Sequence, residues 1–100
     1  MRLRWTLQAA EDLAAIKDFI GRDSPTYARR VVEELYGATV AIPDFPDIGR
    51  IVPERGAPEI REVLLPPYRI IYRRRADLVE VLTIHHSSRV LPDELGSDPV

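Results

Sequence analysis

The second half of the chain contains three strand-like runs with very little chain between them. The runs, rich in β-branched and aromatic residues, are Ile60–Leu65, Tyr68–Arg74 and Leu78–His85 or His86. The connections are only the proline pair Pro66–Pro67 and the dipeptide Ala76–Asp77. Parallel neighbours need a crossover of a dozen or more residues, so strands joined this tightly must pair antiparallel. This half of the chain is therefore predicted to form an antiparallel meander.

The first half of the chain shows one strand pattern and two helix patterns. Residues 2–7, "RLRWTL", alternate polar and apolar side chains, which is typical of a half-buried strand. Apolar residues then recur at helical spacing from Gln8 to Arg22, where Gly21 marks the stop. Ser24 as N-cap and Pro25 at the first helical position begin a second helix, which Pro43 ends. The short link predicts an antiparallel helical hairpin.

The predicted order is therefore β-α-α-β-β-β, an α+β fold in which the helical hairpin packs on an antiparallel sheet. Residues 43–58 carry four prolines and two glycines, so we expect an irregular connection with a short extended piece at Arg50–Val52. Residues 1–92 are predicted to form a single domain. Residues 93–100, "DELGSDPV", are acidic and are expected to form a loose tail.

The composition narrows the classes of function. The chain has no cysteine, which excludes disulfides and thiolate chemistry. It has neither an apolar run of about 18 residues nor an N-terminal signal-peptide core, so no membrane contact and a cytoplasmic location are expected. The net charge of −2 argues against a general nucleic-acid binder. Residues 49–75 nevertheless carry seven arginines against three glutamates, a basic segment that suits either an acidic partner or a solvated sheet face.

The hairpin register places the candidate polar side chains. A two-residue turn at 76–77 would pair Arg73 with Glu80, a cross-strand ion pair, and Arg69 with Ile84. Because side chains alternate along a strand, Arg69 would then share a face with His86. His85 would lie on the other face, so the two histidines are not expected to reach one site.

No catalytic residue is expected unless the chain is an enzyme, in which case Arg61, Arg69, His85 and His86 are the candidates. Imidazoles transfer protons at neutral pH, and each of the two arginines sits beside apolar or aromatic residues. The alternative is structural: a half-buried arginine needs a carboxylate partner, for which Glu62 and Glu59 are the candidates. No metal or cofactor is expected, since adjacent histidines point to opposite faces and no cysteine or carboxylate cluster completes a coordination shell.

Five sequence elements in order resemble the ParE/RelE superfamily, the toxins of bacterial type II toxin–antitoxin modules, also described as plasmid-stabilisation proteins. They are "A-x-x-DL-x-x-I-x-x-(F/Y)-I" in Ala9–Ile20, "FPDIGR" at 45–50, "IRE" at 60–62, "YRIIY" at 68–72 and "H-x-x-R" at His86–Arg89. The fold that the resemblance implies agrees with the order read from the residues.

The resemblance implies one of two activities. RelE-like members are ribosome-dependent mRNA endonucleases; here Arg61 or Arg69 would stabilise the phosphate, and His85 or His86 would transfer protons with Glu62 as a further candidate base. ParE-like members bind DNA gyrase and need no catalytic residue. The acidic net charge and the "YRIIY" and "H-x-x-R" forms favour the ParE branch. The chain is therefore predicted to be a gyrase-binding toxin rather than an enzyme, with mRNA endoribonuclease activity and a non-toxic binding module as the alternatives.

The resemblance also implies a partner. A cognate ParD-like antitoxin would lay a flexible C-terminal segment over the toxin's helices and sheet and mask the toxic surface. Operator DNA would be bound only through the antitoxin complex. The candidate partner-binding residues are Phe19, Tyr27, Tyr36, Arg69 and Arg73, for which ordinary packing is the alternative.

Overall fold

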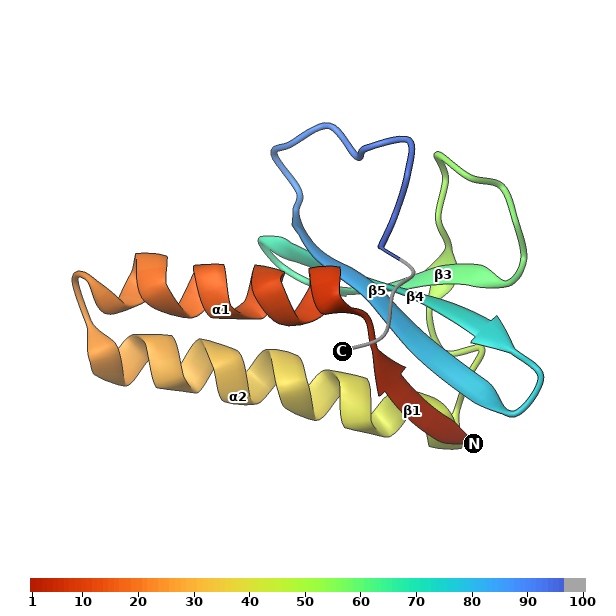
Figure 1. Ribbon diagram of the computed structural model, residues 1–100, viewed down its shortest axis with the longest axis horizontal. Coiled ribbons are helices and arrows are strands. Elements are labelled where there is room, and N and C mark those ends of the chain that lie inside the picture. Colours follow the sequence, from red (N-terminus) through yellow and green to blue (C-terminus); the bar gives the residue numbers. More distant parts are fainter. Residues whose placement is uncertain (97–100) are drawn as a thin grey trace.

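The computed structural model of the protein describes residues 1–96, in which two helices pack on one five-stranded sheet (Figure 1). The elements, in chain order, are β1 (Arg2–Trp5), α1 (Leu7–Gly21), α2 (Pro25–Ala41), the short 3₁₀ helix η1 (Ile42–Asp44), β2 (Arg50–Ile51), β3 (Ile60–Leu65), β4 (Tyr68–Arg75) and β5 (Leu78–His86). The predicted α+β order is confirmed, and β2 lies within the predicted extended piece of the 43–58 connection.

Both helices begin at side-chain caps. The Thr6 hydroxyl accepts a hydrogen bond from the Ala9 N–H at 3.1 Å, and the Ser24 hydroxyl accepts one from the Tyr27 N–H at the same distance. Pro25 occupies the first turn of α2, where a missing N–H costs no helical hydrogen bond. The predicted cap of α2 is confirmed, and the two helices lie side by side as the predicted hairpin (Figure 1).

The sheet has the strand order β1-β5-β4-β3-β2. The β3-β4-β5 meander is antiparallel, as predicted, and β2 pairs antiparallel with β3. β1 adds at the other edge and runs parallel to β5, with Arg4 opposite Glu80. The helices and the rest of the sheet provide the long connection that a parallel pair requires. The sheet is consequently mixed rather than wholly antiparallel.

Apolar side chains cover the sheet on both faces. The larger cluster lies between the sheet and the helices and consists of Ala9, Leu35, Ile42, Ile70, Tyr72, Val79, Val81 and Ile84. The smaller cluster, on the other face, consists of Val52, Ile71, Leu82 and Leu91. Two segments without regular structure, the connection before β3 and the chain after β5, rise together from the sheet in Figure 1 and contribute to this second cluster.

The β4–β5 hairpin contains a β-bulge that changes the predicted register. Arg73 pairs with Glu80 as predicted, and Tyr72 pairs with Val81, but Ile71 pairs with Thr83, which leaves Leu82 as the extra residue. Beyond the bulge Arg69 therefore lies opposite His85, and the predicted pairing of Arg69 with Ile84 is wrong. A one-residue shift moves every later side chain of one strand to the other face.

Asp12 of α1 holds the bulged part of β5. Its carboxylate accepts hydrogen bonds from the backbone N–H of Ile84 at 3.1 Å and from the Thr83 hydroxyl. A bulge leaves a backbone group without its partner on the neighbouring strand. The Asp12 carboxylate supplies the missing acceptor, which gives the "DL" of the α1 motif a structural role.

The chain after β5 returns to the sheet. Arg55 donates hydrogen bonds to the carbonyl oxygens of Pro92 and Asp93 at 2.5 and 2.8 Å, and Leu95 packs against the smaller apolar cluster. Residues 97–100 of the predicted loose tail lie outside the described residues, and the domain boundary at 92 stays a prediction. No helix within residues 1–96 is long and apolar enough to cross a membrane.

Candidate functional site

Arg69 lies at the centre of a buried ion-pair network between β3, β4 and the connection before β3. Its Nε donates to Glu62 at 2.6 Å, and its two terminal nitrogens donate to both oxygens of Glu54 at 2.8 Å. Glu62 is 1% exposed and accepts a second hydrogen bond, from Arg50 at 2.6 Å. The predicted carboxylate partner of Arg69 is thus Glu62, joined by Glu54.

The network changes the electrostatics of Arg69 and Glu54. The hydrogen bonds from Arg69 lower the pKa of Glu54 to about 2, against the opposing effect of burial. The hydrogen bond with Glu54, followed by that with Glu62, raises the pKa of Arg69 above its usual value. A guanidinium paired with two carboxylates has no net positive charge to offer a phosphate, so this arrangement acts as a clamp on the sheet.

Arg61 is held elsewhere. Its side chain donates to the carbonyl oxygens of Pro58 and Gly49, each at 3.0 Å, and its Nε lies 3.6 Å from the Asp47 carboxylate. Arg61 of β3 pairs with Tyr72 of β4, whose ring belongs to the apolar cluster beneath the helices. The Arg61 side chain therefore leaves the sheet on the helix face, opposite to the face of Glu62. The structure does not bring Arg61 and Arg69 to one site.

The two histidines lie on opposite faces, as predicted, but with the assignments reversed. His86 pairs with Tyr68, and their rings meet edge to face with centroids 5.6 Å apart. His85 lies opposite Arg69, and its Nε2 donates to the carbonyl oxygen of Arg89 at 2.9 Å. The prediction that Arg69 shares a face with His86 is wrong, because the β-bulge shifts the register between them.

His86 lines a groove of about 610 Å³ between α1 and the end of the sheet. Tyr68, Arg89, Phe19 and Arg22 also line it, and burial raises the pKa of the Tyr68 hydroxyl. The "H-x-x-R" motif pointed to His86 and Arg89. Sequence reasoning missed Tyr68 and Arg22, which line the same groove only because α1 packs on the sheet at β5.

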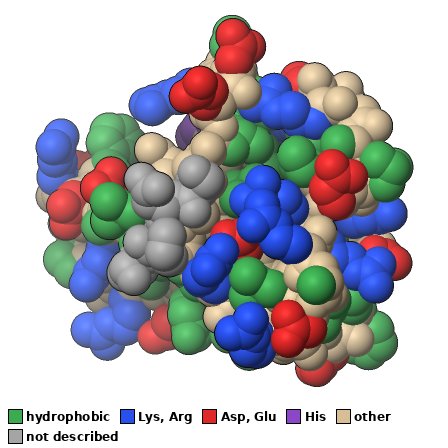
Figure 2. All heavy atoms as spheres, turned by 45° about the vertical axis from the view of Figure 1, so that its right-hand side comes forward, with side chains coloured by type: hydrophobic (Ala, Val, Ile, Leu, Met, Phe, Trp, Pro, Cys, Tyr) green, Lys and Arg blue, Asp and Glu red, His purple; other side chains and the backbone are tan. Residues whose placement is uncertain are grey.

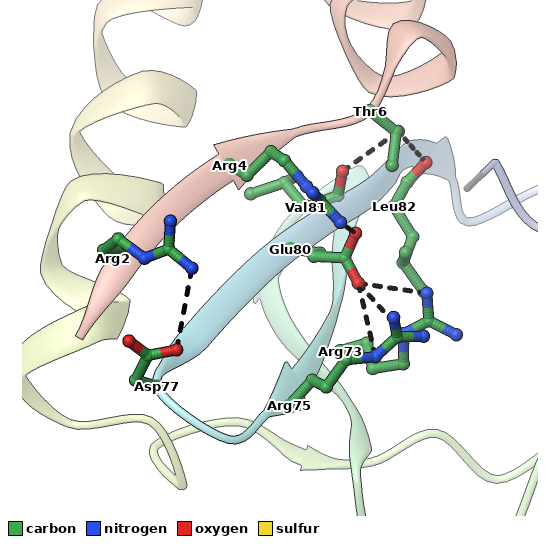
Figure 3. A network of polar contacts seen from close by, with 9 residues as sticks. All are labelled: Arg2, Arg4, Thr6, Arg73, Arg75, Asp77, Glu80, Val81 and Leu82. Carbon is green, nitrogen blue, oxygen red and sulfur yellow. Dashed lines mark hydrogen bonds and ion pairs between the residues drawn. The ribbon is translucent and has the colours of Figure 1, made fainter. Parts of the chain in front are cut away.

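Arg73 belongs to a second network, centred on Glu80 of β5 (Figure 3). Arg73 donates to Glu80 from Nη2 at 3.0 Å, which confirms the predicted ion pair, and Arg4 of β1 donates from the other side. Glu80 is 0% exposed. Burial acts to raise the pKa of Glu80, but the hydrogen bonds from Arg4 and Arg73 outweigh it and the pKa is lowered. Sequence reasoning missed Arg4, since nothing local places β1 beside β5.

The aromatic candidates for partner binding lie on the helical hairpin. Phe19, Tyr27 and Tyr36 are 69%, 55% and 53% exposed. Tyr36 stacks on Trp5, with ring centroids 6.1 Å apart, beside a shallow apolar groove between the two helices. Their exposure suits a docking surface, and their contact with a partner stays a prediction. Residues 1–96 contain no group of three or more His, Asp or Glu side chains able to hold a metal ion.

The helical hairpin packed on a five-stranded mixed sheet defines a small α+β protein. Residues 3–91 match the family described as "ParE toxin of type II toxin-antitoxin system, parDE". The chain belongs to this family of type II toxins, which confirms the resemblance found in the sequence.

Two known proteins show how close the likeness is. The chain is 37% identical to Toxin RelE2 of Caulobacter vibrioides over 87 residues, which cover 86% of this chain and 94% of that protein. Among solved structures, a chain of the chromosomal ParDE TA system from P. aeruginosa is 26% identical, with a TM-score of 0.72. That match covers 86% of this chain and 95% of the other, so the likeness extends over most of the fold.

Proposed function

We propose that this ParE-family toxin inhibits growth by binding DNA gyrase, that a cognate ParD-like antitoxin neutralises it, and that it acts in plasmid stabilisation. The observation that supports a binding mechanism is the scatter of the four catalytic candidates. Arg69 is neutralised by Glu54 and Glu62, Arg61 is held on the other face of the sheet, and His85 and His86 point to opposite faces.

Cleavage of RNA makes a demand that Arg61, Arg69, His85 and His86 together do not meet. A general base, a general acid and a cation must all lie within about 3 Å of the groups reacting at one phosphate. A toxin that only binds its target needs no such convergence. Its location of action would be the cytoplasm, where gyrase works on DNA.

The antitoxin part of the proposal rests on the family and on the exposed aromatic side chains. The solved relative belongs to a ParDE TA system. Phe19, Tyr27 and Tyr36 offer apolar area on the helical hairpin that a segment folding on binding can bury. Operator DNA would then be bound through the antitoxin, consistent with the net charge of −2 on the toxin.

A supercoiling assay tests the gyrase proposal. Purified toxin is added to gyrase, relaxed plasmid and ATP, with topoisomerase IV relaxation as the parallel reaction. We expect loss of supercoiled product, or accumulation of cleaved DNA, that is relieved by adding the antitoxin. Unchanged supercoiling at saturating toxin would refute the gyrase target.

The second candidate function is RelE-like mRNA cleavage. The groove that holds His86, Arg89 and Tyr68 favours it, as does the identity with Toxin RelE2. Induced expression followed by mapping of mRNA ends would then show ribosome-dependent cuts that the His86→Ala variant lacks. Growth arrest with intact transcripts would exclude this function, and unchanged growth without antitoxin would point to a non-toxic binding module.

A further inference from the structure

We propose that the face of the sheet formed by β1, β5 and the end of β4 binds the carboxylates of an acidic polypeptide segment through Arg2, Arg4, Arg73 and Arg75. Basic side chains gather at the centre of the face that Figure 2 shows, where the sheet end of the molecule comes forward. This surface is separate from the aromatic side chains of the helical hairpin, and the inference goes beyond the proposed gyrase target.

The strand register places these side chains in two rows. Arg4, Glu80 and Arg73 are neighbours across three strands, and Arg2, Leu78 and Arg75 form the next row. Residues paired across a sheet share a face, as do residues two apart along a strand. All six side chains therefore leave the sheet on the same face, opposite to the helices, and Figure 3 shows Arg4, Arg73 and Arg75 converging on Glu80.

The charges of this surface do not balance. Four guanidinium groups face the carboxylates of Glu80 and Asp77, four positive charges against two negative ones. Glu80 is fully buried beneath Arg4 and Arg73, and Arg75 approaches it only to 3.9 Å. Arg2 and Asp77 are 3.6 Å apart with side chains 74% and 76% exposed, so water screens this pair strongly.

The hydrogen bonds of the surface are also incomplete. Each guanidinium carries five N–H donors, whereas Glu80 has two acceptor oxygens for three arginines. The Nε of Arg4 is buried and has no acceptor within residues 1–96. The Arg4 side chain as a whole is still 39% exposed, so a ligand carboxylate can reach its outer part. The Arg75 side chain is 57% exposed, so its guanidinium can contact a ligand without any movement of the strand.

Spacing and charge favour an acidic polypeptide over a polynucleotide. Arg2 and Arg4, like Arg73 and Arg75, are two residues apart on a strand, a distance of about 6.6 Å. An extended peptide with carboxylates at every second residue repeats this spacing, and guanidinium groups bind carboxylates through paired hydrogen bonds. The excess of two charges is small, and the chain is acidic as a whole, whereas a polynucleotide needs a longer basic track.

A peptide titration of the isolated toxin tests the inference without gyrase or antitoxin, so its outcome is independent of the proposed target. The probe is the peptide (Glu-Ser)₅ and the matched control is (Gln-Ser)₅, followed by calorimetry and by the arginine Nε–H signals in NMR. We expect (Glu-Ser)₅ alone to bind, to shift the Arg4 signal, and to dissociate as salt is raised.

Two variants locate the binding. Arg75→Gln removes an exposed guanidinium from the surface and should weaken (Glu-Ser)₅ binding about tenfold, as expected for one charge-assisted hydrogen bond. Arg30→Gln removes the same charge from α2, where Arg30 is 74% exposed, and should leave the affinity unchanged. Thermal unfolding of both variants confirms that they are folded. Equal losses in the two variants, or no binding at all, would overturn the inference, as would tighter binding of a ten-nucleotide single-stranded RNA than of the peptide.

Discussion

Arg69 and Glu54, fifteen residues apart in the chain, face each other through two parallel hydrogen bonds of 2.8 Å. The pair ties the connection before β3 to the start of β4, and the same guanidinium reaches Glu62 on β3. Glu62 in turn is bound by Arg50 of β2. The network therefore joins three neighbouring strands and one loop on the face of the sheet away from the helices.

Loss of the central guanidinium should destabilise the fold strongly. In Arg69→Ala the buried Glu62 would keep only Arg50, so we expect the free energy of unfolding to fall by about 3 kcal/mol. Urea denaturation measures the change. Arg30→Ala, which removes an exposed arginine from an i,i+4 pair on α2, should cost no more than about 0.5 kcal/mol. Similar losses in both variants would contradict the role of the network.

The low pKa of Glu54 predicts how stability depends on pH. The pKa in the folded protein is about 2, below the usual 4.5, so ionised Glu54 stabilises the fold above pH 4.5. This contribution is lost as the pH falls from about 4.5 to about 2. The difference in unfolding free energy between wild type and Glu54→Gln should therefore shrink over that range. A difference that stays constant from pH 7 to pH 3 would show that Glu54 does not titrate as proposed.

Asp12 should stabilise the bulged end of β5. The Asp12→Ala substitution leaves the Ile84 N–H and the Thr83 hydroxyl without their acceptor. We expect the free energy of unfolding to fall by about 1–3 kcal/mol. Hydrogen exchange of the Ile84 amide should speed up more than that of amides in β3. Asp18→Ala, at an exposed position of the same helix, is the control and should leave that amide unaffected.

Two glycines should respond in opposite ways to alanine. A Cβ on Gly49 would lie 2.6 Å from the Glu62 carbonyl oxygen and 2.9 Å from the Tyr72 ring, so Gly49→Ala should cost about 1–3 kcal/mol. A Cβ on Gly37, within α2, would have no neighbour within 4 Å, and Gly37→Ala should stabilise by about 0.5–1 kcal/mol. Denaturation curves of the two variants that move in the same direction would contradict this assignment.

Local patterns were sufficient for the elements of the fold. Alternation and helical spacing located the strands and helices, and Ser24–Pro25 located the start of α2. The Arg73–Glu80 pair could be predicted because it lies close to a two-residue turn. The relative positions of Arg69 and His86 could not be predicted, because the bulge between the turn and these residues shifts the strand register by one residue.

The chain by itself determined the class of fold, the family and the cap and turn residues, because these depend on side chains near one another in sequence. Only the tertiary structure decided that β1 lies parallel to β5, which brings Arg4 to Glu80, and that Asp12 of α1 supports a bulge in β5. Both depend on contacts between residues more than seventy positions apart. Such contacts follow from packing the helices on the sheet, which no local pattern encodes.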